Sequence, residues 1–208
     1  MRYNLCYMNK SDLSFLLKEI HTLTFVNPFG SQRDEIEERI LKKLGVGEVS
    51  GPINPIFTKE FNQVLYWVDQ AEQSLLGGMV KNFDSTVRAE QIASLAYFSL
   101  YHKLVDDFDS LINRAEGDTV SNRQLFKKIE RGIKQRSPLV CGGRSAMWEN
   151  PEHLFSCFYQ LRRAFLCLFN EIVGWSEPIR ALRVRVWESI FTKDMHSYQQ
   201  WMHESVGR

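Results

Sequence analysis

Residues 85–115, STVRAEQIASLAYFSLYHKLVDDFDSLINRA, decide the fold class. Apolar side chains recur in this stretch every three or four positions, which places them on one face of an α-helix. The positions that carry the pattern are Ile92, Leu95, Ala96, Leu100, Leu104, Val105, Phe108, Leu111 and Ile112. Gly117 and Asp118 then break it. The spacing predicts one long, heavily buried helix over 85–115 at the centre of the protein.

Shorter helical patterns lie on both sides of this stretch. On its N-terminal side we predict helices that begin at Ser11, Ser31 and Thr58 and end before Asn27, Gly45 and Gly77. On its C-terminal side we predict helices over 121–136, from Pro151 to Gly174, and from Ser176 onward. Proline and glycine set these limits, because proline disfavours a helical residue before it and glycine is common just past a helix end. Alternation over residues 2–8 allows one short strand.

The elements amount to about seven or eight helices with almost no strand. We therefore predict an all-α protein, an antiparallel helical bundle with appended N- and C-terminal helices. The stretch 46–56 is rich in glycine and proline and is the best early boundary. The predicted domains are an N-terminal helical segment over 1–50, a helical bundle with a regulatory role over 55–174, and a helical linker over 175–208.

Bulk properties favour a globular protein of the cytoplasm. The 208 residues are 44% hydrophobic and carry a net charge of +1, so no global field recruits nucleic acid or membrane. No window approaches eighteen consecutive apolar residues, and the N-terminus lacks the pattern of a signal peptide. The four cysteines, Cys6, Cys141, Cys157 and Cys167, have irregular spacing. We interpret them as reduced thiols that mostly fill the core.

No stretch carries a recognisable catalytic or metal-binding pattern. His102 and Asp106 are four positions apart, but a metal site needs more ligands, and the Glu-x-x-His pairs of di-iron bundles do not occur. The acidic run Asp106, Asp107 and Asp109 is typical of a solvated helix edge. No glycine-rich phosphate-binding loop is present. The sequence therefore predicts no catalytic, cofactor-binding or metal-binding residue, and no enzymatic activity of this chain by itself.

A basic segment between Ser121 and Arg144 is the one strongly charged feature. It holds seven bases, Arg123, Lys127, Lys128, Arg131, Lys134, Arg136 and Arg144, against the single acid Glu130. We predict Lys127, Lys128, Arg131 and Lys134 as contacts for an anionic partner. No aromatic side chains alternate with these bases, and no helix-turn-helix follows them, so a solvated face or a protein contact is favoured over nucleic acid.

The C-terminal segment resembles a junction found in bacterial sigma-54-dependent AAA+ enhancer-binding activators. The resemblance rests on Trp187–Asp194 (WESIFTKD) with Tyr198 and Met202, and on Gln160–Phe165, Gly174–Ser176 and Leu182–Arg183 before them. It covers about a quarter of the chain, from Gln160 to Arg208, and concerns packing residues. In that family such a segment leads into the ATPase and its phosphate-binding loop. The Walker motifs, the GAFTGA loop and the DNA-binding helix-turn-helix of the family do not occur here.

The resemblance implies an N-terminal regulatory, signal-receiving region that ends just before the ATPase core. The partners it implies are a downstream AAA+ domain of the same protein and a second copy of the chain. On the last helix we predict an apolar stripe of Ile179, Leu182, Val186, Ile190 and Met195, with Arg183 and Arg185 facing elsewhere. Trp187, Phe191, Tyr198 and Trp201 would then be large apolar surfaces without a local core, available to that linker or interface.

Two other classes of function stay open. One is a free-standing helical domain that binds a protein or a small ligand, favoured by the broad apolar stretch at 85–115 and by the basic segment. The other is an enzyme with a helical active site, which stoichiometric bound metal would support. The signal itself is equally open between a small molecule in the bundle, a partner protein and no signal.

Overall fold

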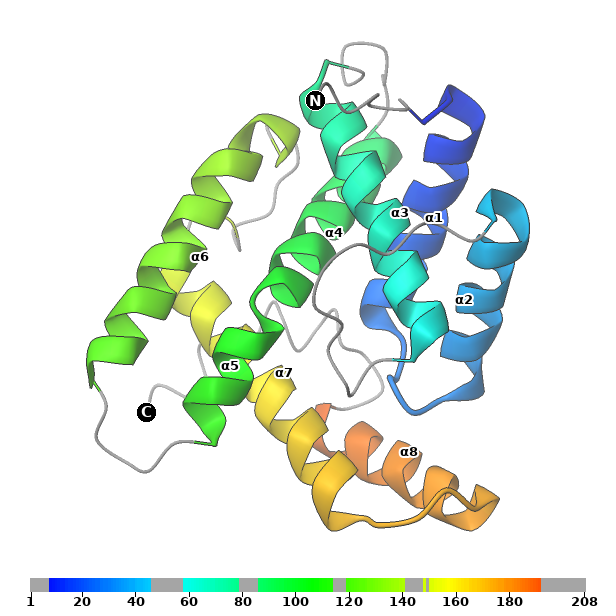
Figure 1. Cartoon of the computed structure of the whole chain (residues 1–208), viewed down its shortest axis with the longest axis vertical. Helices are drawn as coiled ribbons and strands as arrows, with labels where there is room; N and C mark the ends of the chain where they lie inside the picture. Colours follow the sequence, from blue (N-terminus) through cyan, green and yellow to red (C-terminus); the bar gives the residue numbers. More distant parts are fainter. Residues whose placement is uncertain are drawn as a thin grey trace. The chain divides into compact units, whose positions relative to one another are not determined.

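The computed structural model describes residues 8–45, 58–78, 86–113, 119–140, 148 and 150–191, and the regular elements within these ranges are all α-helices (Figure 1). They are α1 (Lys10–Phe25), α2 (Ser31–Leu44), α3 (Lys59–Leu76), α4 (Thr86–Lys103), α5 (Val105–Ile112), α6 (Thr119–Val140), α7 (Pro151–Glu171) and α8 (Glu177–Phe191). The predicted all-α class and helical-bundle packing are confirmed. The short strand predicted near the N-terminus and the loop predicted over 46–56 lie outside the described residues, apart from Met8.

The chain forms two compact units, and both are discontinuous in sequence. Unit 1 consists of Met1–Thr24, Asp34–His102 and Arg136–Gly143. Unit 2 consists of Phe25–Arg33, Lys103–Gln135 and Arg144–Arg208. The segments predicted from the sequence, 1–50, 55–174 and 175–208, do not share these boundaries. The sequence predicts domain boundaries at stretches rich in glycine and proline. Compact units are instead defined by which helices pack together.

The prediction of a single helix over 85–115 is wrong, because α4 and α5 are separate helices. Leu104 lies between them with φ −111° and ψ 2°, outside the helical range. The amide of Phe108 donates to the Leu104 carbonyl at 3.0 Å, so α5 begins at once. Neither glycine nor proline marks the break, and apolar residues continue at near-helical spacing across it. Periodicity alone therefore misses a helix break that lies next to the boundary between the units.

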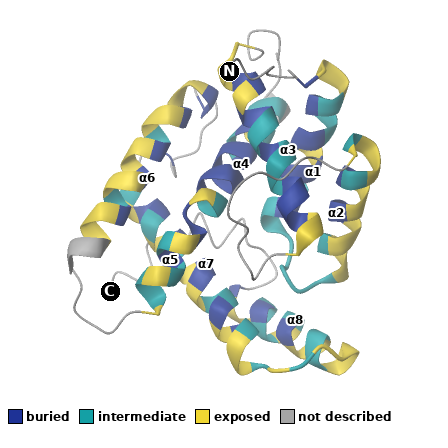
Figure 2. Cartoon of the chain, in the orientation of Figure 1, coloured by how far each residue is buried: buried dark blue, intermediate teal, exposed yellow. Residues whose placement is uncertain are grey.

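Unit 1 is built from α1, α2, α3 and α4 around an aliphatic and aromatic core. Its fully buried side chains include Leu13, Leu16, Leu17, Ile20, Ile36, Ile40, Phe61 and Leu75. Figure 2 shows α4 as mostly buried. The helix limits predicted at Thr58 and Gly45 are confirmed: the Thr58 hydroxyl accepts a hydrogen bond from the Phe61 amide at 3.1 Å, and Gly45 has a positive φ of 80°.

Unit 2 contains α5, α7 and α8, and α7 packs against both of the others. Asn150 caps α7 by accepting from the His153 amide at 3.0 Å, and Pro151 occupies the first turn as predicted. The α5–α7 contact is aromatic, with ring centroids 5.8 Å apart for Phe108 and Phe155. Apolar aromatic packing therefore forms the centre of this unit.

Helix α6 is longer than predicted. It runs past Ser137 and Pro138 to Val140, whereas the sequence pattern ends it at residue 136. Proline removes one backbone hydrogen bond, and this loss is confined here to the last turn of the helix. The extension keeps Arg136 and Leu139 in helical register, and both side chains are buried.

Candidate functional site

The C-terminal end of α7 is capped by a buried arginine from α8. Arg183 Nη2 donates to the Ile172 carbonyl at 2.5 Å, and its Nε donates to the Leu168 carbonyl at 3.4 Å. The last carbonyls of a helix have no partner within it and carry partial negative charge, so a guanidinium satisfies both needs. The Arg183 Cζ also lies 5.3 Å from the centroid of the Trp175 ring. The prediction that Arg183 faces away from the packed side is therefore wrong.

The buried face of α8 differs from the predicted stripe. Arg183, Trp187 and Phe191 are buried at four-residue spacing, while Leu182 and Ile190 are 46% and 43% exposed. The expectation that Trp187 and Phe191 lack a local core is wrong, because their side chains are only 6% and 1% exposed. The buried face of α8 places Arg183 against carbonyls of the α7 terminus that have no partner within their own helix. Tyr198, Trp201 and Met195 lie outside the described residues.

The connection between α1 and α2 also contacts α8 through hydrogen bonds and an aromatic ring. Asn27 Nδ2 donates to the Val184 carbonyl at 3.1 Å, and Arg180 Nε donates to the Phe29 carbonyl at 2.9 Å. The Phe29 ring stacks on Phe165 of α7 at 5.2 Å between centroids and meets the Trp187 ring edge-on at 5.9 Å. Residues 25–33, α7 and α8 therefore form one interlocked contact within unit 2, here called the α8 dock.

Apolar side chains are exposed beside the α8 dock. Val173 is 79% exposed and Trp175 is 81% exposed in the connection between α7 and α8. Gly174 between them has a φ of 121°, which L side chains rarely adopt. The connection therefore holds two large apolar groups in solvent at a turn that glycine permits. Isolated exposed apolar residues are common, but two beside a dock are a candidate contact point.

The predicted anionic-partner residues of α6 divide into two groups. Lys127, Arg131 and Lys134 are exposed on one face and, with Glu130, line a depression of about 350 Å³ that is open to solvent. Lys128 points elsewhere, and its Nζ lies 2.6 Å and 2.8 Å from the two carboxylate oxygens of Asp107. Arg136, counted in the basic segment, is buried. The charge available at this surface is therefore smaller than the sequence count indicates.

Arg136 belongs to a buried polar cluster in unit 1. Its Nε lies 2.6 Å from Glu72 Oε1, and its Nη2 donates to Glu72 Oε2 at 3.1 Å and to Ser99 Oγ at 3.3 Å. Ser99 Oγ in turn donates to Glu72 Oε2 at 3.0 Å. The ionised side chains are 5% and 2% exposed. Glu72 of α3, Ser99 of α4 and Arg136 near the end of α6 are therefore joined by charged hydrogen bonds, which have a structural role here.

Unit 2 holds a second ion pair of the same kind. Arg162 of α7 makes a two-point contact with Asp109 of α5, with Nε on Oδ1 and with Nη2 on Oδ2 at 2.6 Å. The Arg162 side chain is 2% exposed. The interpretation of Asp106, Asp107 and Asp109 as a solvated edge is therefore wrong for Asp109, which pairs with the buried Arg162, whereas Asp107 forms an exposed pair with Lys128. The pairs Asp107–Lys128 and Asp109–Arg162 connect α5 to α6 and to α7.

Periodicity missed these charged core residues, although their positions contain a usable signal. Glu72 lies between Val68 and Leu75 on the apolar stripe of α3, and Arg183 lies four positions before Trp187. A charged residue in phase with an apolar stripe must be buried with a partner or must extend to solvent. The sequence locates such residues, but it does not name the partner.

The histidine and cysteine chemistry is structural in the described residues. His102 and Asp106 lie on different helices, and the His102 ring is 5.1 Å from Phe61 and 4.3 Å from Phe98 between centroids. No group of three or more potential metal ligands occurs in the described part of the chain. Burial raises the pKa of the Cys157 thiol to about 11, which confirms an inert core thiol.

The three remaining cysteines are Cys6, Cys141 and Cys167. Cys167 is exposed, so its assignment to the core is wrong, whereas Cys6 and Cys141 lie outside the described residues.

Among the described helices none has the length and apolar character needed to cross a bilayer. The chain matches no protein-family model, and comparisons with curated proteins and with solved structures find no match either.

Proposed function

We propose that this chain is the regulatory region of a sigma-54-dependent AAA+ activator, and that α8 transmits the state of unit 2 to an ATPase encoded after it. The proposal places the protein in the cytoplasm and assigns no catalysis and no direct nucleic-acid contact to the chain itself. Its sequence support is the junction-like segment that begins at Trp187 in α8. Its structural support is the α8 dock, which joins that same helix to the rest of unit 2.

The observation that carries the proposal is the pair of hydrogen bonds from Arg183 to the end of α7. A hydrogen bond that involves a charged group contributes about 1.5–3 kcal/mol, and a buried carbonyl left without a donor costs a similar amount. Helix α8 is therefore held by a few discrete contacts that can be made or lost together. A ligand or partner that binds one of these states better shifts the population of docked α8.

The proposal is tested first by the reading frame that follows residue 208. It requires a phosphate-binding loop soon after Arg208 and an ATPase in the extended protein. If that ATPase is present, removal of residues 1–175 should change its ATP hydrolysis rate at least about fivefold, the lower end of typical coupling energies. A reading frame without a phosphate-binding loop, or an unchanged rate in the truncated protein, contradicts the proposal.

A second candidate is a free-standing helical protein-interaction domain, and the exposure of Val173 and Trp175 favours it. Such a domain would use the apolar turn beside the α8 dock as its contact, and no ATPase would follow. The reading frame after residue 208 separates the two candidates, because only the regulatory region requires an ATPase there. A Trp175→Ser variant tests the second candidate, in which loss of this 81% exposed ring should weaken binding of the partner.

A further inference from the structure

Helix α6 presents a stripe of exposed charge opposite its buried side. At 100° per residue, Arg123, Lys127 and Glu130 fall within about 60° of one another, whereas Leu125, Ile129 and Arg136 lie on the other side of the helix. The first three side chains are exposed and the second three are buried. Read along the helix, the stripe has the charge order plus, plus, minus. We call Arg123, Lys127 and Glu130 the α6 stripe.

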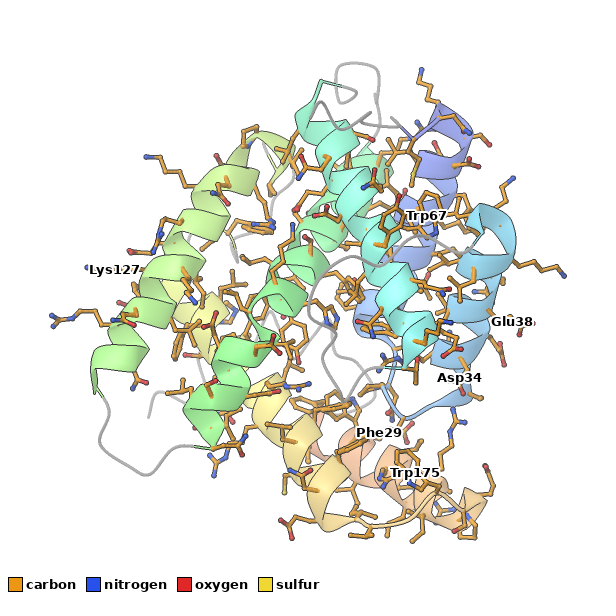
Figure 3. All side chains as sticks on the ribbon, in the orientation of Figure 1. Phe29, Asp34, Glu38, Trp67, Lys127 and Trp175 are labelled. Atoms are coloured by element: carbon orange, nitrogen blue, oxygen red, sulfur yellow. The ribbon has the colours of Figure 1, made fainter. Side chains whose placement is uncertain are left out.

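Helix α2 presents a stripe with the opposite order of charge. Asp34, Glu38 and Lys42 are exposed and lie within about 80° of one another at the same rotation per residue. Read along α2 from its N-terminus, their charges are minus, minus, plus. Figure 3 labels Asp34 and Glu38 on α2 and Lys127 on α6. We call Asp34, Glu38 and Lys42 the α2 stripe.

Neighbouring charges of α2 are already engaged within unit 1. Arg39 Nη2 lies 2.7 Å from Glu19 Oε2, and Lys43 Nζ lies 4.0 Å from Asp12 Oδ1. These two bases therefore neutralise acids of α1 and leave the α2 stripe to face solvent. The stripe residues Glu38 and Lys42 make no ion pair within the described residues. The same holds, within that part of the chain, for Lys127 and Glu130 of the α6 stripe.

We propose that the α6 stripe binds the α2 stripe of a second copy of this chain, with the two helices parallel. In that register Asp34 meets Arg123, Glu38 meets Lys127 and Lys42 meets Glu130. Spacings of four and four residues on α2 rise about 6 Å per step, and spacings of four and three on α6 rise about 6 Å and about 4.5 Å, so the paired groups stay within about 1.5 Å of one another along the two helix axes. Each copy uses two different surfaces, so the contact is head-to-tail and joins successive copies.

Charge complementarity selects a protein over a nucleic acid as the occupant. Glu130 stands within the basic surface and would repel a phosphate backbone, whereas Lys42 of a second copy neutralises it. The α6 stripe also offers no aromatic side chain on which a base would stack. This inference concerns the chain alone and does not depend on the proposed control of an ATPase.

The test measures self-association of the 208-residue chain by sedimentation equilibrium at low and high salt. Exposed charge pairs are screened, since the Debye length falls from about 10 Å at 0.1 M to about 3 Å at 1 M ionic strength. We expect oligomers at low salt that dissociate at 1 M salt. Reversal of the α6 stripe (Arg123→Glu, Lys127→Glu, Glu130→Lys) or of the α2 stripe (Asp34→Lys, Glu38→Lys, Lys42→Glu) should weaken association at least about tenfold.

The decisive arm mixes the two reversed variants, each of which repels itself. In the mixture the reversed α6 stripe of one chain faces the reversed α2 stripe of the other, so association should return. The control is Lys18→Glu, Lys59→Glu, Glu60→Lys, which alters exposed residues of α1 and α3 and gives the same change in net charge as the α6 reversal. Circular dichroism verifies that each variant is folded.

Each other result overturns the proposal. A wild-type chain that stays monomeric at low salt and high concentration removes the second copy as the occupant. Association that survives both reversals, or that the mixture does not restore, removes these stripes as the contact. A monomeric wild-type chain that binds a short DNA duplex, with binding lost on reversal of the α6 stripe, assigns the stripe to nucleic acid instead.

Discussion

The guanidinium of Arg183 lies against the carbonyl of Ile172, with Nη2 and the oxygen 2.5 Å apart. The donor belongs to α8, and the acceptor lies just past the last residue of α7. This contact places a charge where the dipole of α7 favours it and satisfies a carbonyl that the helix itself cannot satisfy. It lies on the same buried face of α8 as Trp187 and Phe191.

Replacement of Arg183 by alanine should destabilise the protein by about 2–4 kcal/mol. The variant leaves the carbonyls of Leu168 and Ile172 without their donor and removes the arginine stem from a buried site. Urea denaturation followed by circular dichroism measures the loss. The matched control is Arg185→Ala, two positions along the same helix, where the side chain is exposed and the expected change is within about 0.5 kcal/mol. Equal effects of the two substitutions would rule out the capping role.

The buried pair Glu72–Arg136 should be costly to break from one side. Glu72→Ala leaves an uncompensated guanidinium in the core and should cost about 3–5 kcal/mol. The double variant Glu72→Leu, Arg136→Met replaces both charges with apolar side chains and should recover at least about 2 kcal/mol of that loss. Chemical denaturation of both variants measures the difference, with Glu60→Ala on the exposed side of α3 as the control. A double variant no more stable than Glu72→Ala would contradict the account.

Burial of Cys157 should make the folded state less stable in alkaline solution. The thiol pKa is about 11 in the folded protein and 9.0 in the reference state, so between these values the unfolded chain loses a proton that the folded chain keeps. The free energy of unfolding therefore falls as pH rises from 9 to 11, by about 2–3 kcal/mol at 1.36 kcal/mol per pKa unit. Cys157→Ala should show a shallower decline. Identical slopes in denaturation curves across this range would contradict the assignment.

Thiol reactivity should separate the two described cysteines. Cys167 is exposed, whereas Cys157 is buried and its Sγ lies 3.5 Å from His153 Nε2. In the native protein at neutral pH, iodoacetamide should modify Cys167 at least about tenfold faster than Cys157, because the reagent needs an accessible thiolate. Peptide mass mapping over time measures both rates, and urea should equalise them. A native Cys157 that reacts as fast as Cys167 would show that α7 opens readily.

The sequence predicts the capped starts of helices more successfully than it predicts a break inside an apolar pattern. Thr58 and Asn150 lie just before helices and accept hydrogen bonds from residues three positions on, a local pattern that the residue types make visible. The break at Leu104 has no local marker, because neither glycine nor proline stands there and apolar residues continue across it. Helix caps depend on neighbouring residues that the sequence shows, whereas the residues around Leu104 give no such signal.

The site shows the same contrast between local and distant information. Lys127, Arg131 and Lys134 were predicted from local charge, and the structure brings them together on one exposed face. Trp187 and Phe191 were expected without a local core, because the sequence does not show that Phe29 approaches from the other end of the chain. A pattern of apolar residues assigns every charged residue to the exposed side of a helix. It therefore cannot predict that Arg183 is buried as the cap of a neighbouring helix.

The most direct test of the account is ATP hydrolysis by the protein extended with its native downstream sequence. The account predicts an ATPase whose rate changes at least about fivefold in Arg183→Ala, because loss of this contact releases α8 from α7. Arg185→Ala, on the exposed side of the same helix, should match the wild-type rate. No hydrolysis in the extended protein, or equal rates in the wild type and in Arg183→Ala, would contradict the claim that docked α8 carries the signal.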